Sequence, residues 1–431
     1  MSKSPSILQT LLPDNLHQES IFILASHRVD GEHLIALGKE DEFVLETSSD
    51  DALDYFQRWL DKTSDWKFGF ISYDVKNCIE DLDSKEPNRA GFPLIHFVRP
   101  RFVIRYLPAT SHMEVLKGDT ELLKGIALKE LFHKAEANNS SQHATTLRLA
   151  PRINRAQYLQ AVTQLQRHIQ EGDIYEVNYC QEFYAEESLS DAFAVWQRLN
   201  TFTEAPFSSF LQLGDHYLLS ASPERYLKKT GSRIISQPIK GTIKRGKTDA
   251  EEQALKDALY HSEKERSENV MIVDLVRNDL SKSAKRGTVR VDELFGVYTF
   301  KTVHHLISTV SGEVKEGTTF TQILRDTFPM GSMTGAPKIR AMQLIDEYEY
   351  SRRGLYSGSV GYITPSGDFD FNVVIRSIVY NAAKPYISCS VGSAITMLSV
   401  PEKEYEECLL KAEAIMKTLH GKLHESKNLS F

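Results

Sequence analysis

A lysine beside a glycine is the first side chain in this sequence that could do chemistry. Lys240 lies in QPIKGTIKRG, residues 237–246, where proline and glycine predict a turn. A lysine amine becomes a nucleophile when desolvation lowers its pKa, and Gly241 would let backbone amides approach a ligand closely. A surface lysine in a turn explains the same residues, and by itself this explanation is the stronger one.

Carboxylates form the second candidate group. Glu224 follows an apolar strand, and Glu268 lies in a long helical block. Glu404, Glu407 and Lys411 share one face of the final helix. Carboxylates from separate helices could hold Mg²⁺, which prefers a few protein oxygens together with substrate oxygens. Spacing alone favours a solvated Glu–Lys pair instead, which contributes little to stability.

Three further side chains could bind an anionic ligand. Arg376 falls in the middle of an expected strand and suits bidentate carboxylate binding, although the solvated face of a sheet fits equally well. Thr334 belongs to GSMTGAPK, residues 331–338, which precedes an amphipathic helix and could present backbone amides to an anion. His305 lies in an expected strand, where a lone histidine is more often a core or surface residue.

Both strands and helices are expected to position these side chains, which predicts an α+β protein. Residues 1–109 alternate short apolar runs with polar turns and predict mostly strands, with a helix near residues 51–60. Residues 133–150 show no periodicity and are the best linker candidate. We therefore expect a mostly β region over 1–150, followed by a catalytic region.

The rest of the chain holds longer helices. Helical spacing predicts a helix over residues 154–173 with Asn154 as its cap, one helical block over 249–280 and a last helix over 401–423. Residues 356–392 predict a meander of three antiparallel strands. These elements place the catalytic region at 151–420, with a C-terminal tail over 421–431.

Composition excludes several classes of protein. The chain has 431 residues, 41% of them apolar, and a formal net charge of −7. A nucleic-acid binder would show a basic excess, and a membrane span would need about 18 consecutive apolar residues; neither is present. The N-terminus does not resemble a signal peptide, so we expect a cytoplasmic protein. The four scattered cysteines predict neither a disulfide framework nor a zinc site.

Eight short motifs occur in a fixed order over residues 222–412: SPER, PIKGT, ENVMIVDLVRNDL, HHLIS, GSMTGAPK, YSGSVGYI, FNVVIR and EYEECLLKA. Together with INRAQY and NYCQEF upstream, they resemble the chorismate-utilising enzyme family. That family contains anthranilate synthase component I, aminodeoxychorismate synthase component I, and the isochorismate and salicylate synthases. The resemblance covers about residues 154–415. It implies two facing antiparallel β-sheets flanked by helices, with the active site in the cleft between them.

Within the family, the chain most resembles the aminodeoxychorismate synthase component I branch, because anthranilate synthases similar to it carry alanine where Lys240 stands. The resemblance implies that Lys240 attacks C2 of chorismate while Glu224 protonates the leaving C4 hydroxyl. It implies Mg²⁺ as the cofactor, held by Glu268 and Glu407 with Glu404 in support. The activity implied is a Mg²⁺-dependent amination of chorismate, of the aminotransferase class, in 4-aminobenzoate and folate biosynthesis.

The resemblance also assigns the substrate-binding residues. Arg376 and Tyr356 would bind the enolpyruvyl carboxylate, and Lys411 would accompany the metal-bound carboxylate. The pocket would be lined by Gly241, Thr242, His305 and Thr334 and by a loop containing Gly392, Ser393 and Ala394.

Two positions depart from the family pattern. Glu176 stands where isochorismate and salicylate synthases carry a water-activating lysine and where amination enzymes usually carry glutamine, which argues against the water-adding branches. Ala394 replaces a customary glycine. No cysteine lies in a glutaminase-type GxCxG pattern, so we expect ammonia to come from a separate glutaminase subunit (component II) in a heterodimer. Anthranilate synthase component I and a non-catalytic binding relative are the rival interpretations.

Overall fold

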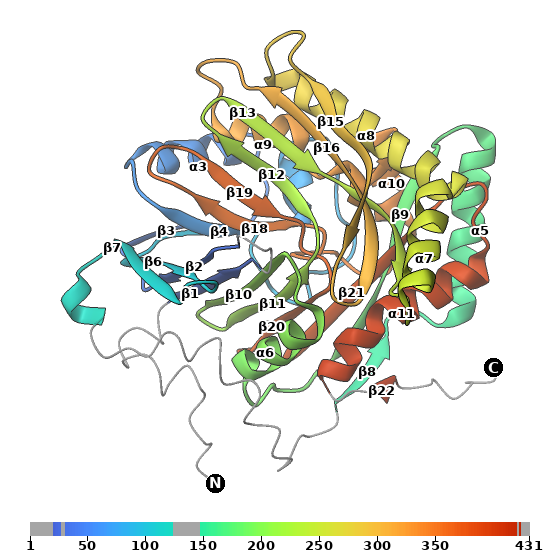
Figure 1. Cartoon of the computed structure of the whole chain (residues 1–431), viewed down its shortest axis with the longest axis horizontal. Helices are drawn as coiled ribbons and strands as arrows, with labels where there is room; N and C mark the ends of the chain where they lie inside the picture. The colour runs from blue at the N-terminus through green and yellow to red at the C-terminus, as the bar shows by residue number, and fades with distance from the viewer. Residues whose placement is uncertain (1–19, 27–30, 124–146, 420–421, 424–431) are drawn as a thin grey trace.

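Two β-sheets face each other in the computed structural model, which describes residues 20–26, 31–123, 147–419 and 422–423 (Figure 1). Strand pairing is antiparallel in both sheets, except between two short strands, β22 and β8. The 12-stranded sheet runs in the order β22 (Lys422–Leu423), β8 (Arg148–Pro151), β9 (Glu176–Ala185), β21 (Tyr386–Ile395), β20 (Ser377–Asn381), β11 (His216–Ser222), β10 (Phe207–Leu213), β1 (Ser20–Ala25), β2 (His33–Leu37), β6 (Phe102–Leu107) and β7 (His112–Lys117), and β17 (Gly335–Ala336) pairs with β9.

The second sheet has ten strands and lies over the first. Its order is β14 (Ile239–Lys244), β16 (Val303–Glu313), β13 (Arg233–Gln237), β12 (Arg225–Thr230), β19 (Phe369–Asn372), β18 (Ser359–Ile363), β4 (Lys67–Ile71), β5 (Ile95–Arg99) and β3 (Asp41–Leu45), and β15 (Arg290–Thr299) pairs with β16. Strands from residues 20–117 therefore contribute to both sheets.

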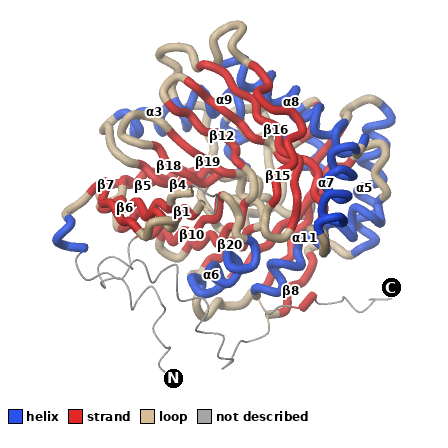
Figure 2. Tube along the Cα trace, in the orientation of Figure 1, coloured by secondary structure: helices blue, strands red, loops and turns tan. Residues whose placement is uncertain are grey.

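Helices cover the outer faces of the sheets, so the molecule has four layers (Figure 2). The 12-stranded sheet is covered by α5 (Arg155–Glu171), α6 (Ala192–Thr203), α10 (Lys338–Tyr348) and α11 (Pro401–Thr418). The ten-stranded sheet is covered by α3 (Ala52–Asp61), α8 (Glu263–Ser283) and α9 (Phe320–Thr327), and α7 (Asp249–His261) precedes α8. Short 3-10 helices lie at Tyr73–Cys78, Thr120–Leu123 and Gly331–Met333.

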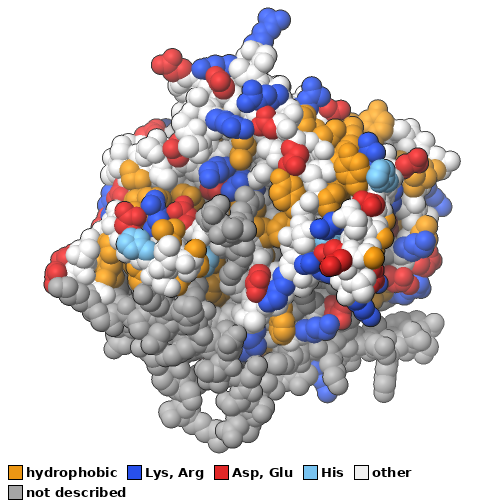
Figure 3. Space-filling model, in the orientation of Figure 1, with side chains coloured by type: hydrophobic (Ala, Val, Ile, Leu, Met, Phe, Trp, Pro, Cys, Tyr) orange, Lys and Arg blue, Asp and Glu red, His pale blue; other side chains and the backbone are white. Residues whose placement is uncertain are grey.

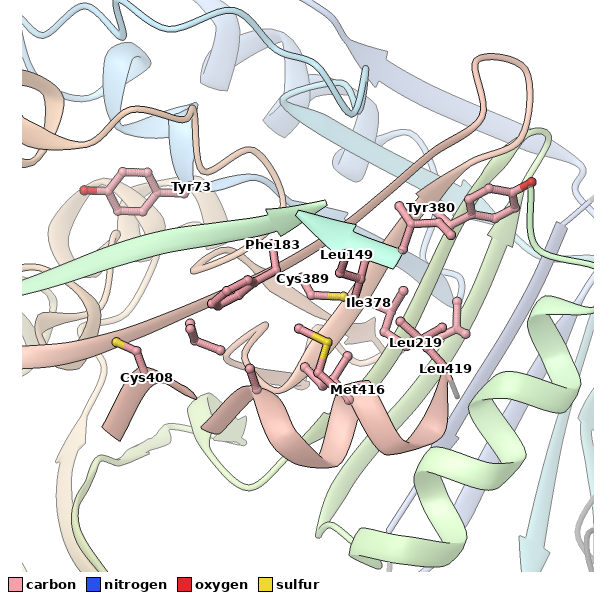
Figure 4. Close-up of a cluster of buried hydrophobic side chains, with 14 of the residues drawn as sticks. Tyr73, Leu149, Phe183, Leu219, Ile378, Tyr380, Cys389, Cys408, Met416 and Leu419 are labelled. Atoms are coloured by element: carbon pink, nitrogen blue, oxygen red, sulfur yellow. The ribbon is translucent and has the colours of Figure 1, made fainter. Parts of the chain in front are cut away.

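This layering explains the apolar runs in the strands, because a strand between two layers buries both of its faces. In β1, Ile21 and Ile23 face the helices, whereas Phe22 packs between the sheets with Phe68 of the opposite sheet. Figure 4 shows the outer core of the 12-stranded sheet, where Met416 of α11 lies among side chains of the strands. Each large apolar side chain buried in this way stabilises the fold by about 1.5–3 kcal/mol.

Several expected elements are confirmed. The helices expected near 51–60, over 154–173 and over 401–423 are α3, α5 and α11, and Asn154 caps α5 by accepting a hydrogen bond from the Gln157 amide. All four cysteines are buried and free. The expected linker covers residues 133–150, and its residues 133–146 lie outside the described residues.

Other expectations about the elements are wrong. The helical block over 249–280 is two helices, α7 and α8, because the chain turns at Ser262, whose hydroxyl caps α8. The expected three-stranded meander is four strands, β18 to β21, because the middle strand leaves one sheet after β19 and enters the other as β20. Lys240 lies in strand β14, not in a turn, and Gly392, Ser393 and Ala394 lie in β21, not in a loop.

The face in Figure 3 carries basic and acidic side chains interspersed over the described residues, with no basic stripe. Among the helices that the structure describes, none is long and apolar enough to cross a membrane.

Candidate active site

Two of the candidate residues lie where the chain passes from one sheet to the other. Glu224 stands between β11 and β12, and Arg376 stands between β19 and β20. Backbone hydrogen bonds join the two crossings, from the Val373 amide to the Glu224 carbonyl at 3.0 Å and from the Ala221 amide to the Arg376 carbonyl at 3.2 Å. Arg376 has φ +53° and is not mid-strand as the alternation predicted, because a strand that changes sheets must leave its ladder.

Lys240 owes its position to a bulge in β14. The pairing of β14 with β16 shifts register between Ile239 and Thr242, and Gly241 has φ +88°, which favours glycine. The bulge directs the Lys240 side chain inward, where it is 8% exposed and donates to Glu176 Oε1 at 2.6 Å. Burial alone would lower the pKa of Lys240, but Glu176, Glu268 and Glu224 raise it. We call Lys240, Glu176 and Glu224 the lysine centre.

Glu224 has the environment of a general acid. Its carboxyl is 4% exposed, and burial raises its pKa to about 7 even though Ser332 and Lys240 act in the opposite direction. The Ser332 hydroxyl donates to Glu224 Oε1 at 2.6 Å and so fixes the direction of the carboxyl. A carboxyl with a pKa near neutrality can donate a proton at the pH where most enzymes work.

Four carboxylates from two helices converge beside the lysine centre. Glu265 and Glu268 lie one turn apart on α8, and Glu404 and Glu407 lie one turn apart on α11. Burial alone would lower the pKa of Lys264, but all four of these carboxylates raise it. The Lys264 amine lies 3.9 Å from Glu268 Oε1 and 3.7 Å from Glu404 Oε1. We call the four carboxylates the carboxylate cluster.

The carboxylate cluster fits a hard divalent cation. Glu268 Oε1 is buried and has no hydrogen-bond partner among the described residues, and burial raises the pKa of Glu268 to about 7. Burial would raise the pKa of Glu407 as well, but its ion pair with Lys411 at 2.6 Å leaves that pKa lowered. Carboxylate oxygens are the ligands that Mg²⁺ prefers. Glu268, Glu404 and Glu407 therefore lie around the same Lys264 amine, although their carboxylate oxygens do not all lie within 4.8 Å of one another among the described residues, and their role as metal ligands stays a prediction.

Arg376 and Tyr356 also lie together. Burial lowers the pKa of Arg376, and Tyr356 and Glu407 oppose that effect, so both lie near its guanidinium. The Tyr356 hydroxyl accepts a weak hydrogen bond from the Cys180 thiol at 3.6 Å, and burial holds its pKa well above the ordinary value. Among the described residues, the Arg376 guanidinium has no hydrogen-bond partner of its own. Arginine and a neutral tyrosine form a donor pair suited to a carboxylate.

His305 is held neutral next to this pair. Burial, followed by the charge of Arg376, lowers the pKa of His305 to about 3. Its Nδ1 lies 2.9 Å from the Thr242 hydroxyl and 3.4 Å from the Gly241 carbonyl. A neutral imidazole in this position can offer hydrogen bonds without adding charge.

The remaining candidates do not all point into the site. Gly392 has no room for a side chain, because a Cβ there would lie 2.5 Å from Cys180 Sγ. Lys411 donates to the Gly392 carbonyl at 2.7 Å. The Ser393 side chain lies on the opposite face of β21, near Tyr158, whereas Ala394 shares the face of Gly392. The buried Thr334 hydroxyl bonds to backbone carbonyls of its own loop.

Sequence reasoning missed several residues of the site. Ser332 was visible only as part of GSMTGAPK, and nothing in the spacing links it to Glu224. Glu265 repeats the i,i+3 spacing of Glu404 and Glu407, and that signal could have found it. The buried Arg353 donates to the Met333 and Asn178 carbonyls and pairs with Glu349 at 2.6 Å, so it ties the loop before Thr334 to β9.

A separate cavity of about 440 Å³ lies between the sheets and contains none of the candidate residues. Its polar lining includes Arg225 and Asp370, which form two hydrogen bonds of 2.9 Å with each other.

Comparison with known proteins agrees with this geometry. The model of the chorismate binding enzyme family matches residues 17–417. The chain belongs to the chorismate-binding enzymes. It is 36% identical over 356 residues to anthranilate synthase component 1 of Thermus thermophilus, covering 81% of this chain and 76% of that protein. It is 42% identical over 362 residues to aminodeoxychorismate synthase of Streptomyces griseus, covering 81% of this chain and 49% of that protein.

The fold also matches that of a solved family member. Anthranilate synthase component I of Streptococcus pneumoniae TIGR4 superposes with a TM-score of 0.78 and 26% identity, over 89% of this chain and 92% of that chain. The expected architecture of two facing antiparallel sheets with flanking helices is therefore confirmed. The roles of the individual site residues stay predictions.

Proposed function

We propose that this chorismate-utilising enzyme is an aminodeoxychorismate synthase component I, which replaces the C4 hydroxyl of chorismate with an amino group. The observation that carries the proposal is a buried lysine amine beside Glu224, a carboxyl with a pKa near neutrality. The 42% identity to the Streptomyces griseus enzyme supports the same reaction.

Chorismate carries two carboxylates, and the site has two places to receive them. Arg376 and Tyr356 bind the enolpyruvyl carboxylate through charge-assisted hydrogen bonds. Glu268 and Glu407, with Glu404 in support, would hold a Mg²⁺ ion, whose charge would neutralise the ring carboxylate. The substrate is thereby oriented with its C2 atom toward Lys240 and its C4 hydroxyl toward Glu224.

The chemistry is a pair of displacements, each transmitted through the ring diene. The neutral amine of Lys240 forms a bond to C2, both ring double bonds shift, and the C4–O bond breaks while Glu224 gives its proton to the leaving oxygen, which departs as water. Ammonia then forms a bond to C4, both double bonds shift back, and the C2–N bond to Lys240 breaks. The new C4 ammonium returns one proton to Glu224. The net reaction consumes chorismate and ammonia and releases 4-amino-4-deoxychorismate and water.

Ammonia comes from a second protein in this proposal. The Thermus thermophilus relative bears the designation component 1, which implies a partner component. A glutaminase subunit that forms a heterodimer with this chain would deliver ammonia to the site, and the product would continue towards 4-aminobenzoate and folate.

Anthranilate synthesis is the second candidate, favoured by the match to the Streptococcus pneumoniae structure. Lys240 argues against it, because anthranilate formation needs no covalent attachment of the substrate to the enzyme.

A product assay tests the proposal. The purified chain is incubated with chorismate, Mg²⁺ and ammonium at mildly alkaline pH, and the products are separated before and after adding an aminodeoxychorismate lyase. We expect a product that the lyase converts to 4-aminobenzoate. Fluorescent anthranilate formed without the lyase would contradict the proposal and support the second candidate.

A further inference from the structure

Glu176 is the closest charged partner of the reactive lysine. It begins strand β9, where Ala336 of β17 pairs with it, and its side chain is 1% exposed. Its Oε1 atom accepts from the Lys240 amine at 2.6 Å, and the two residues lie on opposite sheets. The pair therefore bridges the two sheets inside the site.

The other carboxylate oxygen of Glu176 lacks a hydrogen-bond partner among the described residues. Glu176 Oε2 is buried and makes no hydrogen bond with any residue that the structure describes. A purely structural ion pair is stable in the interior only when its remaining hydrogen-bonding capacity is satisfied, because an unsatisfied buried oxygen costs about 1–3 kcal/mol. A buried oxygen without a hydrogen bond calls for an explanation, and beside a nucleophile a role in proton exchange provides one.

Three carboxyl groups lie around Lys240, and a comparison of their roles indicates which one can take its proton. Glu176 on β9, Glu268 on α8 and Glu224 at the β11–β12 crossing act on its amine. Glu224 must keep its proton for the leaving hydroxyl, and Glu268 belongs to the carboxylate cluster. Among these three carboxyl groups of the described residues, Glu176 is the one that accepts a hydrogen bond from the amine.

We propose that Glu176 is the catalytic base of the lysine centre: it takes a proton from the Lys240 ammonium before the attack on C2 and returns it when the C2–N bond breaks. This inference rests on the proposed function. The proton balance closes, because Lys240 begins and ends as an ammonium ion and Glu176 begins and ends as a carboxylate. The role belongs to this chain in particular, since a glutamine at the same position could not accept a proton.

The test follows formation of the covalent adduct, not turnover. Wild type, Glu176→Gln and Glu176→Asp are mixed with chorismate and Mg²⁺ without ammonium, and the fraction of protein that gains the mass of chorismate less one water is followed by intact-mass spectrometry from pH 6 to pH 10. Glu186→Gln, at an exposed position just after β9, is the matched control. Thermal unfolding of each variant shows whether it folds like the wild type.

We expect Glu176→Gln to slow adduct formation near neutral pH by about 10²–10⁴-fold, because no carboxylate then takes the proton of Lys240. The substitution also removes a charge that raises the pKa of Lys240, so the rate should recover as the pH rises and the lysine loses its proton to solvent. Glu176→Asp should retain part of the rate. The base role is overturned if Glu176→Gln forms the adduct as fast as the wild type at neutral pH. It is also overturned if the wild type aminates chorismate without forming any adduct.

Failure of the proposed function has a different signature. A wild-type enzyme that produces anthranilate, and no product that the lyase accepts, would reject the amination at C4 and with it the base role. Correct amination by wild type and by Glu176→Gln at equal rates would reject the base role alone.

Discussion

The lysine centre and the carboxylate cluster are neighbours, but they differ in how far their charges are balanced by direct contacts. In the lysine centre, one ammonium lies between two buried carboxyls, and the contact of 2.6 Å between Lys240 and Glu176 neutralises it locally. In the carboxylate cluster, four carboxylates surround Lys264, whose contacts of 3.7 and 3.9 Å are longer than hydrogen bonds, and Glu268 Oε1 has no hydrogen-bond partner among the described residues. The first arrangement is suited to moving protons, and the second to receiving an additional cation.

The elements that carry the two groups explain the difference. The lysine centre comes from strands and from a sheet crossing, where a bulge or a turn fixes one side chain at a time. The carboxylate cluster comes from two helices, where the i,i+3 spacing presents pairs of side chains. This difference between the two groups can be tested by changing one residue of each group and measuring a different property for each change.

The largest effect is expected for Lys240→Ala. Amination of chorismate should fall by about 10³-fold or more, because the covalent step disappears, while Mg²⁺ binding should change little. The check is the rate of lyase-dependent 4-aminobenzoate formation beside a Mg²⁺ titration. A normal amination rate in Lys240→Ala would remove the nucleophile from the account.

A smaller effect, on Mg²⁺ binding, is expected for Glu268→Gln. Its affinity for Mg²⁺, measured by titration calorimetry, should fall by at least about 10-fold, because one charged oxygen ligand is lost. Glu263→Gln, an exposed position on the same helix, is the control and should bind Mg²⁺ normally. Equal affinities in the two variants would show that the carboxylate cluster does not hold the ion through Glu268.

The smallest effect is expected for Ser332→Ala. The Ser332 hydroxyl donates to Glu224 and thereby lowers the pKa of that carboxyl, so its removal should raise the pKa. A general acid works only while protonated, so the alkaline limb of the kcat/KM profile should move to higher pH, by less than about one unit. Ser332→Thr keeps the hydroxyl and should leave the limb in place. A shift to lower pH would contradict the assignment of Glu224 as the acid.

The sequence singled out candidate residues that the structure brings together, but it did not predict the backbone that positions them. Glu224, Lys240 and Glu268 were identified by motifs in a fixed order, and the structure brings their charges within mutual influence. Local spacing could not reveal the bulge at Gly241, because a bulge depends on the register with a neighbouring strand distant in sequence.

The change of sheets at Arg376 was missed for a related reason. Residues 369–381 alternate like one continuous strand, and alternation does not say to which sheet a residue belongs. The contact between Ser332 and Glu224 joins residues 108 positions apart, and no periodicity predicts it. Helices such as α5, by contrast, carry their caps and apolar stripe in consecutive residues and were found with nearly correct bounds.

The central claim is that Lys240 binds the substrate covalently, and peptide mapping tests it most directly. The wild-type chain is incubated with chorismate and Mg²⁺ in the absence of ammonium, digested, and the peptide containing Lys240 is identified by tandem mass spectrometry. The account predicts that this peptide carries the mass of chorismate less one water on Lys240, and that adding ammonium removes it. An unmodified Lys240 in an enzyme that still forms 4-amino-4-deoxychorismate would contradict the account.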